Sequence, residues 1–375
     1  MRIALRRQLN LRIFLNMFKL IKKSKIRQGI LKTRHGEVKT PFFMPDATRA
    51  VVKMIGSQEV GQLGVEAMVV NTLHLYLQPG MKVIKKSKGV HNFMGFEGPL
   101  LSDSGGFQVF SLAHKRNMGK IDDKQVVFKS PIDGSRHVLT PEKSIQIQFD
   151  LGADMMVVLD DCPPNEFDRK SIEKSVERTI NWARRCRVEY DKQIKKRNIK
   201  DKDRPLIFGV IQGGVELDLR KKCAGELIKL NFDGYGFGAR PVDEQGKFLD
   251  KVLEYTAALI PEDKLRFALG IGTPEDIKRC VKMGWDMFDC VVPTREARHG
   301  RLYVDKGKGY KVINISNAQY RESNKAIDTK CGCELCKNYS ASYLHHLFKI
   351  KEPLSQRLAT IHNLYFYCGW MKKIV

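Results

Sequence analysis

The chain has 375 residues, of which 42% are hydrophobic, so it is long enough for one large domain or two ordinary ones. No run approaches the roughly 20 apolar residues that cross a bilayer, which argues against a membrane protein. Lys and Arg total 66 against 42 Asp and Glu, a formal net charge of +24. This excess favours a polyanionic partner, most often a nucleic acid, although solvated lysine faces would also produce it.

The cysteines and the N-terminus bear on the cellular compartment. Nine cysteines are present, an odd number, and no secretory leader is recognisable. A disulfide framework is therefore not expected, and the default location is a reducing cytoplasm. Residues 1–16 form a basic and apolar extension in which Asn10 and two arginines interrupt any long apolar stretch. An amphipathic arm and an upstream start codon, with Met17 as the true start, both fit this extension.

Eight short apolar runs occur in order between about residue 40 and residue 291. They cover residues 41–44, 67–71, 99–103, 155–160, 206–212, 234–238, 267–272 and 287–289. Continuous apolar runs are typical of buried parallel strands. Helical spacing from Ile172 to Ala183 predicts a helix, and Pro141 and Thr273-Pro274 are typical helix starts. Eight strand–helix units predict an α/β fold, a TIM (β/α)8 barrel, rather than an open sheet.

Four of these runs stop on a polar residue that could take part in chemistry. Asp103, Asp160, Gln212 and Asp289 occupy these positions. In a (β/α)8 barrel, reactive groups gather where the strands end, at the C-terminal face. We therefore expect three carboxylates and one amide to point into a single pocket. Asp161, next to Asp160, is expected to face the other way and to be structural.

Glycine pairs and arginines follow these strand ends. Gly105-Gly106 and Gly213-Gly214 permit tight turns and a close approach of a flat ligand to the backbone. Phe107 is a candidate to stack on that ligand. After Asp289, the stretch from Arg295 to Arg301 reads as a loop with three arginines that could clamp phosphates.

Cys331, Cys333 and Cys336 place three thiols within six residues. Zinc prefers four tetrahedral thiolate and imidazole ligands, and a closed set of four makes the site structural. Spacing alone leaves the fourth ligand open among His345, His346, His362 and Cys368. Residues 17–300 are accordingly predicted to form the catalytic barrel. Residues 301–375 are predicted to form a zinc-binding subdomain with a closing helical segment, and residues 191–205 an exposed charged connection.

Taken together, these segments resemble the tRNA-guanine transglycosylase family, also called queuine tRNA-ribosyltransferases, in its bacterial form. The likeness extends from about Gly29 to Tyr367 and is specific as a set. The matching strings are residues 102–108, 128–130 with 133–134, 160–162, 212–214, 270–276, 288–295 and Cys331-x-Cys333-x-x-Cys336 with His362. The resemblance implies a TIM barrel with an inserted zinc subdomain, a structural Zn²⁺ in each subunit and a homodimer. It also implies exchange of the wobble guanine of GUN-anticodon tRNAs for 7-aminomethyl-7-deazaguanine, in queuosine biosynthesis.

The resemblance also implies a role for each matching residue. Asp289 corresponds to the nucleophile that attacks the ribose, and Asp103 to the general acid/base. The base would be bound by Asp103, Ser104, Phe107, Asp160, Gln212, Gly238, Ala239 and Leu269. Arg295 and Arg298 would bind tRNA, and the zinc ligands would be Cys331, Cys333, Cys336 and His362. Retaining glycosidases likewise use two carboxyl groups that flank the anomeric carbon. One is the nucleophile that forms a covalent intermediate, and the other is the general acid/base.

One loop departs from the family pattern. Residues 239–244 read Ala-Arg-Pro-Val-Asp-Glu, where the bacterial family usually has a second Gly and then Leu-Ala-Val-Gly-Glu. Ala239 stays small and Glu244 keeps the acid, but Arg240 and Pro241 do not fit, so the inserted base is open. Alternatives are a non-catalytic tRNA-binding subunit of a heteromeric enzyme, or an active paralogue that inserts queuine or modifies another nucleic acid. Retention of all four polar strand ends favours the active enzyme.

Overall fold

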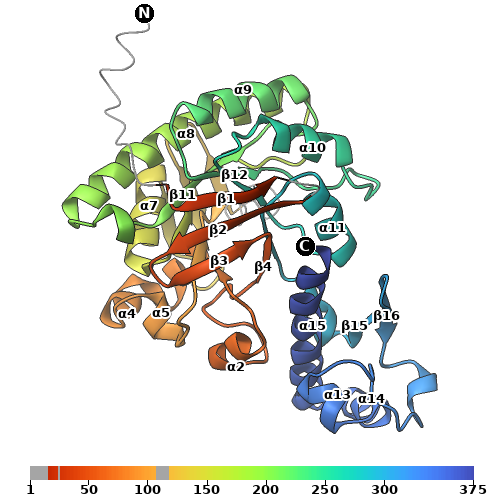
Figure 1. The fold of residues 1–375 in the computed structure, drawn as a ribbon. Coiled ribbons are helices and arrows are strands. Elements are labelled where there is room, and N and C mark those ends of the chain that lie inside the picture. The colour runs from red at the N-terminus through yellow and green to blue at the C-terminus, as the bar shows by residue number, and fades with distance from the viewer. Residues whose placement is uncertain (1–15, 24–25, 107–117) are drawn as a thin grey trace, which may run out of the picture.

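A computed structural model describes residues 16–23, 26–106 and 118–375. At its centre lies an eight-stranded parallel sheet in the order β4-β14-β13-β12-β11-β10-β6-β5 (Figure 1). The strands are β4 (Phe42–Pro45), β5 (Met68–Asn71), β6 (Leu100–Asp103), β10 (Met155–Val157), β11 (Leu206–Ile211), β12 (Gly234–Phe237), β13 (Leu265–Ala268) and β14 (Met287–Cys290). A parallel bridge between Asp46 and Val69 joins β4 to β5 and completes the ring. The predicted barrel is confirmed, and each predicted run overlaps one strand.

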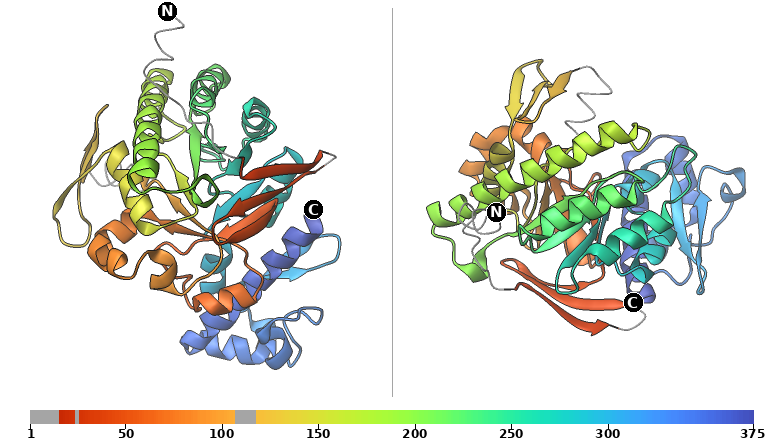
Figure 2. Two further views of the ribbon diagram at one scale, coloured as in Figure 1. Left: turned by 60° about the vertical axis from the view of Figure 1, so that its left-hand side comes forward. Right: turned by 90° about the horizontal axis from the view of Figure 1, so that it is seen from above.

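Helices surround this ring (Figures 1 and 2). They are α2 (Ser57–Gln62), α3 (Thr72–Leu75), a π-helical turn (Tyr76–Gly80), α4 (Met81–Lys86), α5 (Val90–Met94), α7 (Pro141–Leu151), α8 (Arg169–Lys196), α9 (Leu217–Ile228), α10 (Asp250–Leu259), α11 (Pro274–Lys282) and α12 (Val292–Arg298). The two predicted helix starts are confirmed. Thr140 and Thr273 cap α7 and α11 by accepting the amides of Lys143 and Asp276.

Two small antiparallel sheets attach to the barrel. One consists of β1 (Phe18–Lys23), β2 (Arg27–Thr33) and β3 (Gly36–Thr40), and its buried side chains pack on the strand residues inside the barrel. The other, β7 (Gly119–Ile121), β8 (Val126–Lys129) and β9 (Arg136–Leu139), projects beside α8 (Figure 2). The indole nitrogen of Trp182 on α8 donates to the carbonyl of Asp123, which fixes this second sheet.

Alternate strand residues form two separate apolar clusters. Phe42, Met44, Val69, Leu101, Phe208, Val210, Phe267 and Met287 belong to one cluster. The residues between them, such as Phe43, Val70 and Ile211, belong to the other, which includes the helices. Because successive side chains of a strand point to opposite faces, the first cluster fills the barrel and the second surrounds it. The next inward positions at the carboxyl ends are Asp46, Asn71, Asp103, Gln212, Gly238, Leu269 and Asp289.

The amino end of the barrel uses carboxylates differently. Asp154, Asp233 and Asp286 each directly precede a strand, and each accepts a backbone amide at 2.9 Å from the neighbouring strand segment. Each also pairs with a positively charged or titratable side chain: His35 at 2.7 Å, Arg204 at 2.6 Å and Arg27 at 2.9 Å, respectively. These acids, of which Asp154 and Asp286 are buried, are therefore satisfied structurally, as expected for the stability face of a barrel.

The prediction of an exposed connection over residues 191–205 is wrong for its first part. Helix α8 continues to Lys196, and Gln193 and Ile194 are buried within it. Arg204, near the end of the segment, is also buried. A run of charges is typical of a loop, but it equally describes the solvent-facing side of a long helix.

The C-terminal part packs beside the barrel (Figure 1). It comprises β15 (Arg301–Asp305), β16 (Tyr310–Asn314), a 3-10 turn (Ala318–Tyr320), α13 (Glu334–Asn338), α14 (Ala341–Lys349) and α15 (Pro353–Ile374). Helix α15 joins the two parts. Tyr367 donates to the carbonyl of Gly272 at 2.6 Å, and Trp370 donates to that of Pro274 at 2.9 Å. No helix in the described ranges is both long enough and apolar enough to cross a membrane.

Asn363 provides a test of this attachment. Its fully buried amide donates to the carbonyls of Pro293 and Arg301 and accepts from the amide of Tyr303. Asn363→Ala should lower the free energy of unfolding by about 2–4 kcal/mol, because three buried backbone groups lose their partner. Urea unfolding measures this. Asn181→Ala, at an exposed site on α8, should change the value by no more than about 0.5 kcal/mol. Equal effects of the two substitutions would contradict the role of Asn363.

Candidate active site

Asp103 ends β6 in a network of donors. Asn71 Nδ2 donates to one carboxylate oxygen at 2.5 Å, and the amides of Thr72 and Gly105 donate to the other at 3.0 and 3.2 Å. Burial raises the pKa of Asp103 to about 7, although these hydrogen bonds act against the shift. A carboxyl with a pKa near neutrality can both release and take up a proton.

Asp160 and Gln212, which follow the adjacent strands β10 and β11, contact each other. Gln212 Nε2 donates to Asp160 at 2.7 Å, and the hydroxyl of Ser104 lies 3.4 Å from the other carboxylate oxygen. Burial raises the pKa of Asp160 to about 6. Gly238 makes room for this pair, because a Cβ atom there would lie 2.4 Å from Gln212 Nε2. Asp160 itself lies beyond β10, which ends at Val157 rather than at the predicted position.

Asp289 lies near the end of β14, where the amide of Gly270 donates to its carboxylate at 2.8 Å. Burial raises its pKa, and the charges of Asp46 and Asp103 raise it further. Asp289, Asp103 and Asp46 therefore form one electrostatically interacting group of carboxylates. Two of the polar strand ends, Asp103 and Asp289, thus interact electrostatically, and the group contains one acid that the sequence interpretation did not identify.

That additional acid, Asp46, and its neighbour Arg295 are placed by β4 and α12. Asp46 occupies the inward position next after Met44, and the positive charge of Arg295 lowers its pKa while burial raises it. Arg295 and Arg298 lie on α12, so the prediction of a loop there is wrong: Pro293 occupies the first turn of a helix. Arg298 Nη1 is buried and has no hydrogen-bond partner among the described residues.

The loop after β12 is held by two consecutive residues, Asn165 and Glu166. Asn165 Nδ2 donates to the carbonyls of Arg240 and Val242, and Arg240 pairs with Glu166 at 3.3 Å. Ala239 has a φ of 124°, a backbone conformation that favours glycine. The departure at residues 240–241 thus belongs to an anchored loop next to Gly238, and Glu244 is exposed.

Arg220 on α9 is a supporting residue that the sequence interpretation missed. Its guanidinium donates to the carbonyls of Gly214, Ile211 and Gly238 at 2.8, 3.2 and 3.0 Å. It lies 4.1 Å from the centre of the Phe237 ring, and burial lowers its pKa to about 9. One buried cation thereby connects the ends of β11 and β12. A basic residue in a helix gives no sequence signal for such a position.

The remaining predicted residues have different outcomes. Leu269 follows β13 and packs partly buried against the interior cluster. Phe107 lies outside the described residues. Asp161 forms a 2.5 Å ion pair with Arg178 on α8, as expected for a structural acid.

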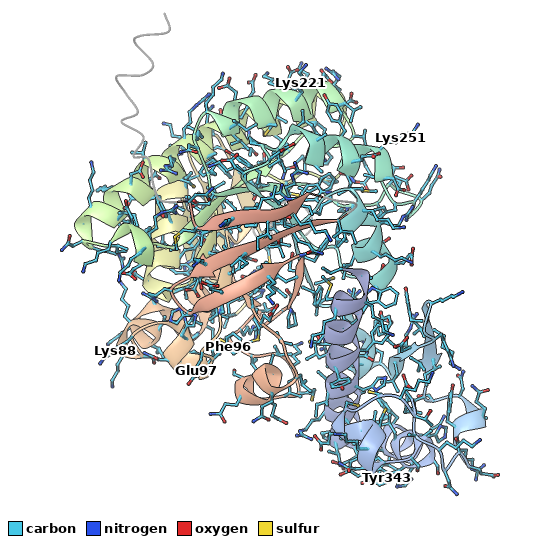
Figure 3. All side chains as sticks on the ribbon, viewed as in Figure 1. Lys88, Phe96, Glu97, Lys221, Lys251 and Tyr343 are labelled. Carbon is cyan, nitrogen blue, oxygen red and sulfur yellow. The ribbon has the colours of Figure 1, made fainter. Side chains whose placement is uncertain are left out.

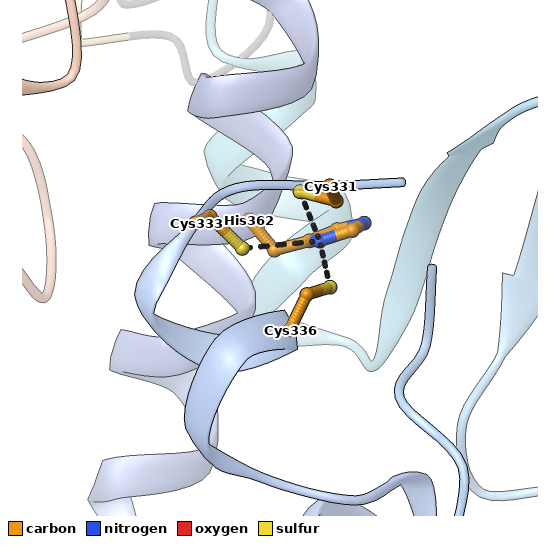
Figure 4. A group of neighbouring side chains, drawn as sticks. All are labelled: Cys331, Cys333, Cys336 and His362. Carbon is orange, nitrogen blue, oxygen red and sulfur yellow. Dashed lines mark hydrogen bonds between the residues drawn. The ribbon is translucent and has the colours of Figure 1, made fainter. Parts of the chain in front are cut away.

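The predicted cysteines lie together with His362 of α15 (Figure 4). The Cys331, Cys333 and Cys336 sulfurs lie 3.8, 3.5 and 3.3 Å from His362 Nδ1. Ligands of a tetrahedral zinc would be about 3.6 Å apart, so the four residues fit this ion. His362 Nε2 donates to the carbonyl of Tyr303 at 2.8 Å, which leaves the Nδ1 lone pair free for a metal. His345 is engaged instead with the carbonyl of Ile315.

A barrel with carboxylates at the C-terminal ends of its strands and a separate Cys3His cluster defines an α/β-barrel enzyme with a structural metal site. A family model described as queuine tRNA-ribosyltransferase matches residues 22–374. Proteins named queuine tRNA-ribosyltransferase from Halothermothrix orenii and Caldanaerobacter subterraneus subsp. tengcongensis are each 44% identical. The alignments cover 94% and 95% of this chain and 90% and 92% of the relatives. The chain belongs to the queuine tRNA-ribosyltransferase family, and it is a transferase.

The Cys3His cluster predicts that the chain binds metal in the purified state. Wild type should contain about one zinc per chain, and Cys336→Ser should lose it, because a hydroxyl is a poor zinc ligand. Elemental analysis by mass spectrometry measures the metal. Cys368→Ala on α15 is the matched control and should keep its zinc. A zinc-free wild type, or equal zinc in both variants, would refute the assignment.

Proposed function

We propose that this protein exchanges the wobble guanine of GUN-anticodon tRNAs for a 7-deazaguanine, most readily 7-aminomethyl-7-deazaguanine. Membership of the family supports exchange of a guanine in tRNA on the way to queuosine. The observation that carries the finer proposal is the assembly of Asp289, Asp103, Asp160 and Gln212 at one end of the barrel. The net charge of +24 suits a polyanionic substrate.

In this proposal Asp289 is the nucleophile. Its carboxylate attacks C1′ of the ribose, the glycosidic bond to guanine breaks, and a covalent enzyme–RNA ester forms. The incoming base then attacks C1′ from the opposite side and releases Asp289. The Gly270 amide keeps the carboxylate oriented. Ionisation of Asp289 requires loss of its proton, which its neighbouring carboxylates oppose.

Asp103 is the proposed general acid/base. It would donate a proton to the ring nitrogen of the departing guanine and accept one from the incoming base. A pKa of about 7 suits both directions of transfer. Asn71, the amide of Thr72 and the amide of Gly105 hold the carboxyl in place through both steps.

The remaining residues of the proposed site would bind the base. Ionised Asp160 would accept hydrogen bonds from the pairing edge of guanine, which carries donors there, and would disfavour adenine. Gln212 would donate to the base carbonyl, while Ser104, Gly238 and Ala239 shape the pocket and Phe107 and Leu269 enclose the ring. The target nucleotide must be turned out of the anticodon loop to reach these groups.

Outside the pocket, Arg295 and Arg298 are proposed to hold RNA phosphates. The unpartnered Nη1 of Arg298 is suited to an anionic oxygen. Lys221 and Lys251 are exposed and point outwards from α9 and α10 (Figure 3). Zinc, held by Cys331, Cys333, Cys336 and His362, would serve structure alone, because four protein ligands leave no site for substrate. A homodimer also belongs to this proposal.

The assignment of Asp289 is tested with Asp289→Asn. An amide cannot replace the carboxylate in attack, so incorporation of radiolabelled guanine into tRNA should fall at least about 1000-fold. Binding of tRNA in a filter assay should stay within about threefold of wild type. Asp263→Asn, at an exposed position, should keep full activity. Full activity of Asp289→Asn would exclude the nucleophile role. Anticodon mass spectrometry with guanine, 7-aminomethyl-7-deazaguanine or queuine identifies the inserted base.

The raised carboxyl pKa values predict an acid limb of activity. Asp289 and Asp160 act in their ionised forms, and both pKa values are raised above the ordinary value near 3.8. As pH falls through these raised values, about 8 for Asp289 and about 6 for Asp160, both groups gain protons, so kcat/KM should decline between about pH 8 and pH 5. Thermal melting over the same range checks that the protein stays folded. A constant kcat/KM down to pH 5 would contradict the prediction.

A further inference from the structure

Asp46 belongs to the same inward layer as the proposed catalytic residues but has no role in the mechanism above. Inward residues Phe42 and Met44 of β4 lie beneath it in the interior cluster. Strand β4 lies between β14 and β5, with Met44 opposite Asp289 and Asp46 bridged to Val69. Asp46 therefore follows Met44 by two residues and points to the same inner face. It lies on the strand adjacent to that of Asp289, one side-chain layer closer to the carboxyl end.

The carboxylate of Asp46 has no side-chain hydrogen bond within the described ranges, unlike Asp103, Asp160 and Asp289. Its electrostatic neighbours are Arg295 on one side and Asp289 and Asp103 on the other. An acceptor kept partly desolvated and unpaired beside like charges is costly to the free protein. That cost is offset when a ligand brings a hydrogen-bond donor to the site.

The chemistry of an RNA strand limits what this donor can be. Asp289 must reach C1′ and Arg295 would hold a flanking phosphate, so the ribose lies between them, beside Asp46. In an internal nucleotide the 3′ and 5′ oxygens are phosphate esters and donate no hydrogen bond. The 2′-hydroxyl is thus the one donor that the ribose offers, and it is bonded to the carbon next to C1′.

We propose that Asp46 accepts a hydrogen bond from a ribose 2′-hydroxyl at the target nucleotide or its immediate neighbour, and thereby selects RNA over DNA. This inference rests on the proposed function of the same pocket. In retaining glycosidases, a hydrogen bond to the sugar hydroxyl beside the reacting carbon strengthens in the transition state. Asp46 would act in the same way, as a specificity-determining residue for the exchange.

The alternative role for Asp46 is to hold Arg295. Loss of that support would weaken phosphate binding and would reduce the activity on every substrate by a similar factor. Loss of a 2′-hydroxyl acceptor would instead reduce the activity on ribose and leave deoxyribose comparatively unaffected. A comparison of this ratio of activities between wild type and each variant separates these roles. The intrinsic difference in reactivity between ribosides and deoxyribosides cancels in that comparison.

The experiment measures kcat/KM for radiolabelled guanine incorporation into an anticodon stem–loop RNA. Matched stem–loops carry a single 2′-deoxy sugar at the target guanosine, at its 5′ neighbour or at its 3′ neighbour. Wild type, Asp46→Ala, Asp46→Asn and Arg295→Gln are compared, after zinc content and thermal melting establish that each is folded. Asp46→Asn keeps one neutral acceptor and covers the case in which Asp46→Ala does not fold.

We expect one of the three deoxy substitutions to reduce wild-type kcat/KM by roughly ten- to hundredfold, the range for a hydrogen bond to a charged group. Asp46→Ala should abolish most of that ribose preference, Asp46→Asn should keep part of it, and Arg295→Gln should keep all of it. An unchanged ratio in both Asp46 variants, or no preference in wild type, overturns the inference alone. Failure of wild type to incorporate guanine into any stem–loop overturns the proposed function, and this inference with it.

Discussion

Alternate residues of the eight strands point into a barrel whose interior has room only for side chains. Phe208, Phe267 and Met287 fill its lower layers, so the inward-facing polar groups lie at the carboxyl ends of the strands. Those groups then meet above an apolar floor that excludes water from beneath. Proximity and desolvation therefore come from one geometric constraint, and no loop has to bring Asp103 and Asp289 together.

This arrangement concentrates negative charge inside the barrel. Burying several carboxylates is unfavourable, and the two ends of the barrel compensate for it with different partners. At the carboxyl end, amides and neutral side chains such as Asn71 and Gln212 donate to the acids without neutralising them. At the amino end, Asp233 and Asp286 have arginine partners. The same residue type thus has arginine partners within hydrogen-bond distance at one end, and mainly neutral donors at the other.

Much of this could be predicted from the sequence, because buried parallel strands leave an unambiguous apolar pattern. The eight strands and the Cys3His cluster are confirmed, and the four polar residues lie at or just after the carboxyl ends of their strands. Asp46 was missed because Pro45 follows the apolar run and separates it from the acid. Arg220 was missed, and α12 was predicted as a loop, because charge alone does not distinguish a buried cation or a short helix from a solvated segment. The alternation of inward and outward side chains along β4 identifies Asp46 as an inward residue once the positions of Phe42 and Met44 are known.

The seam between the first and last barrel strands has a consequence for biosynthesis. Residues 42–45 of β4 pair with residues 287–290 of β14, so the first strand lacks one neighbour until most of the chain has left the ribosome. Arg27 and Asp286 are separated by 259 residues. Such long-range pairing slows folding and prolongs exposure of apolar strand edges. The nascent barrel is consequently an open crescent during translation, and it becomes a closed cylinder late.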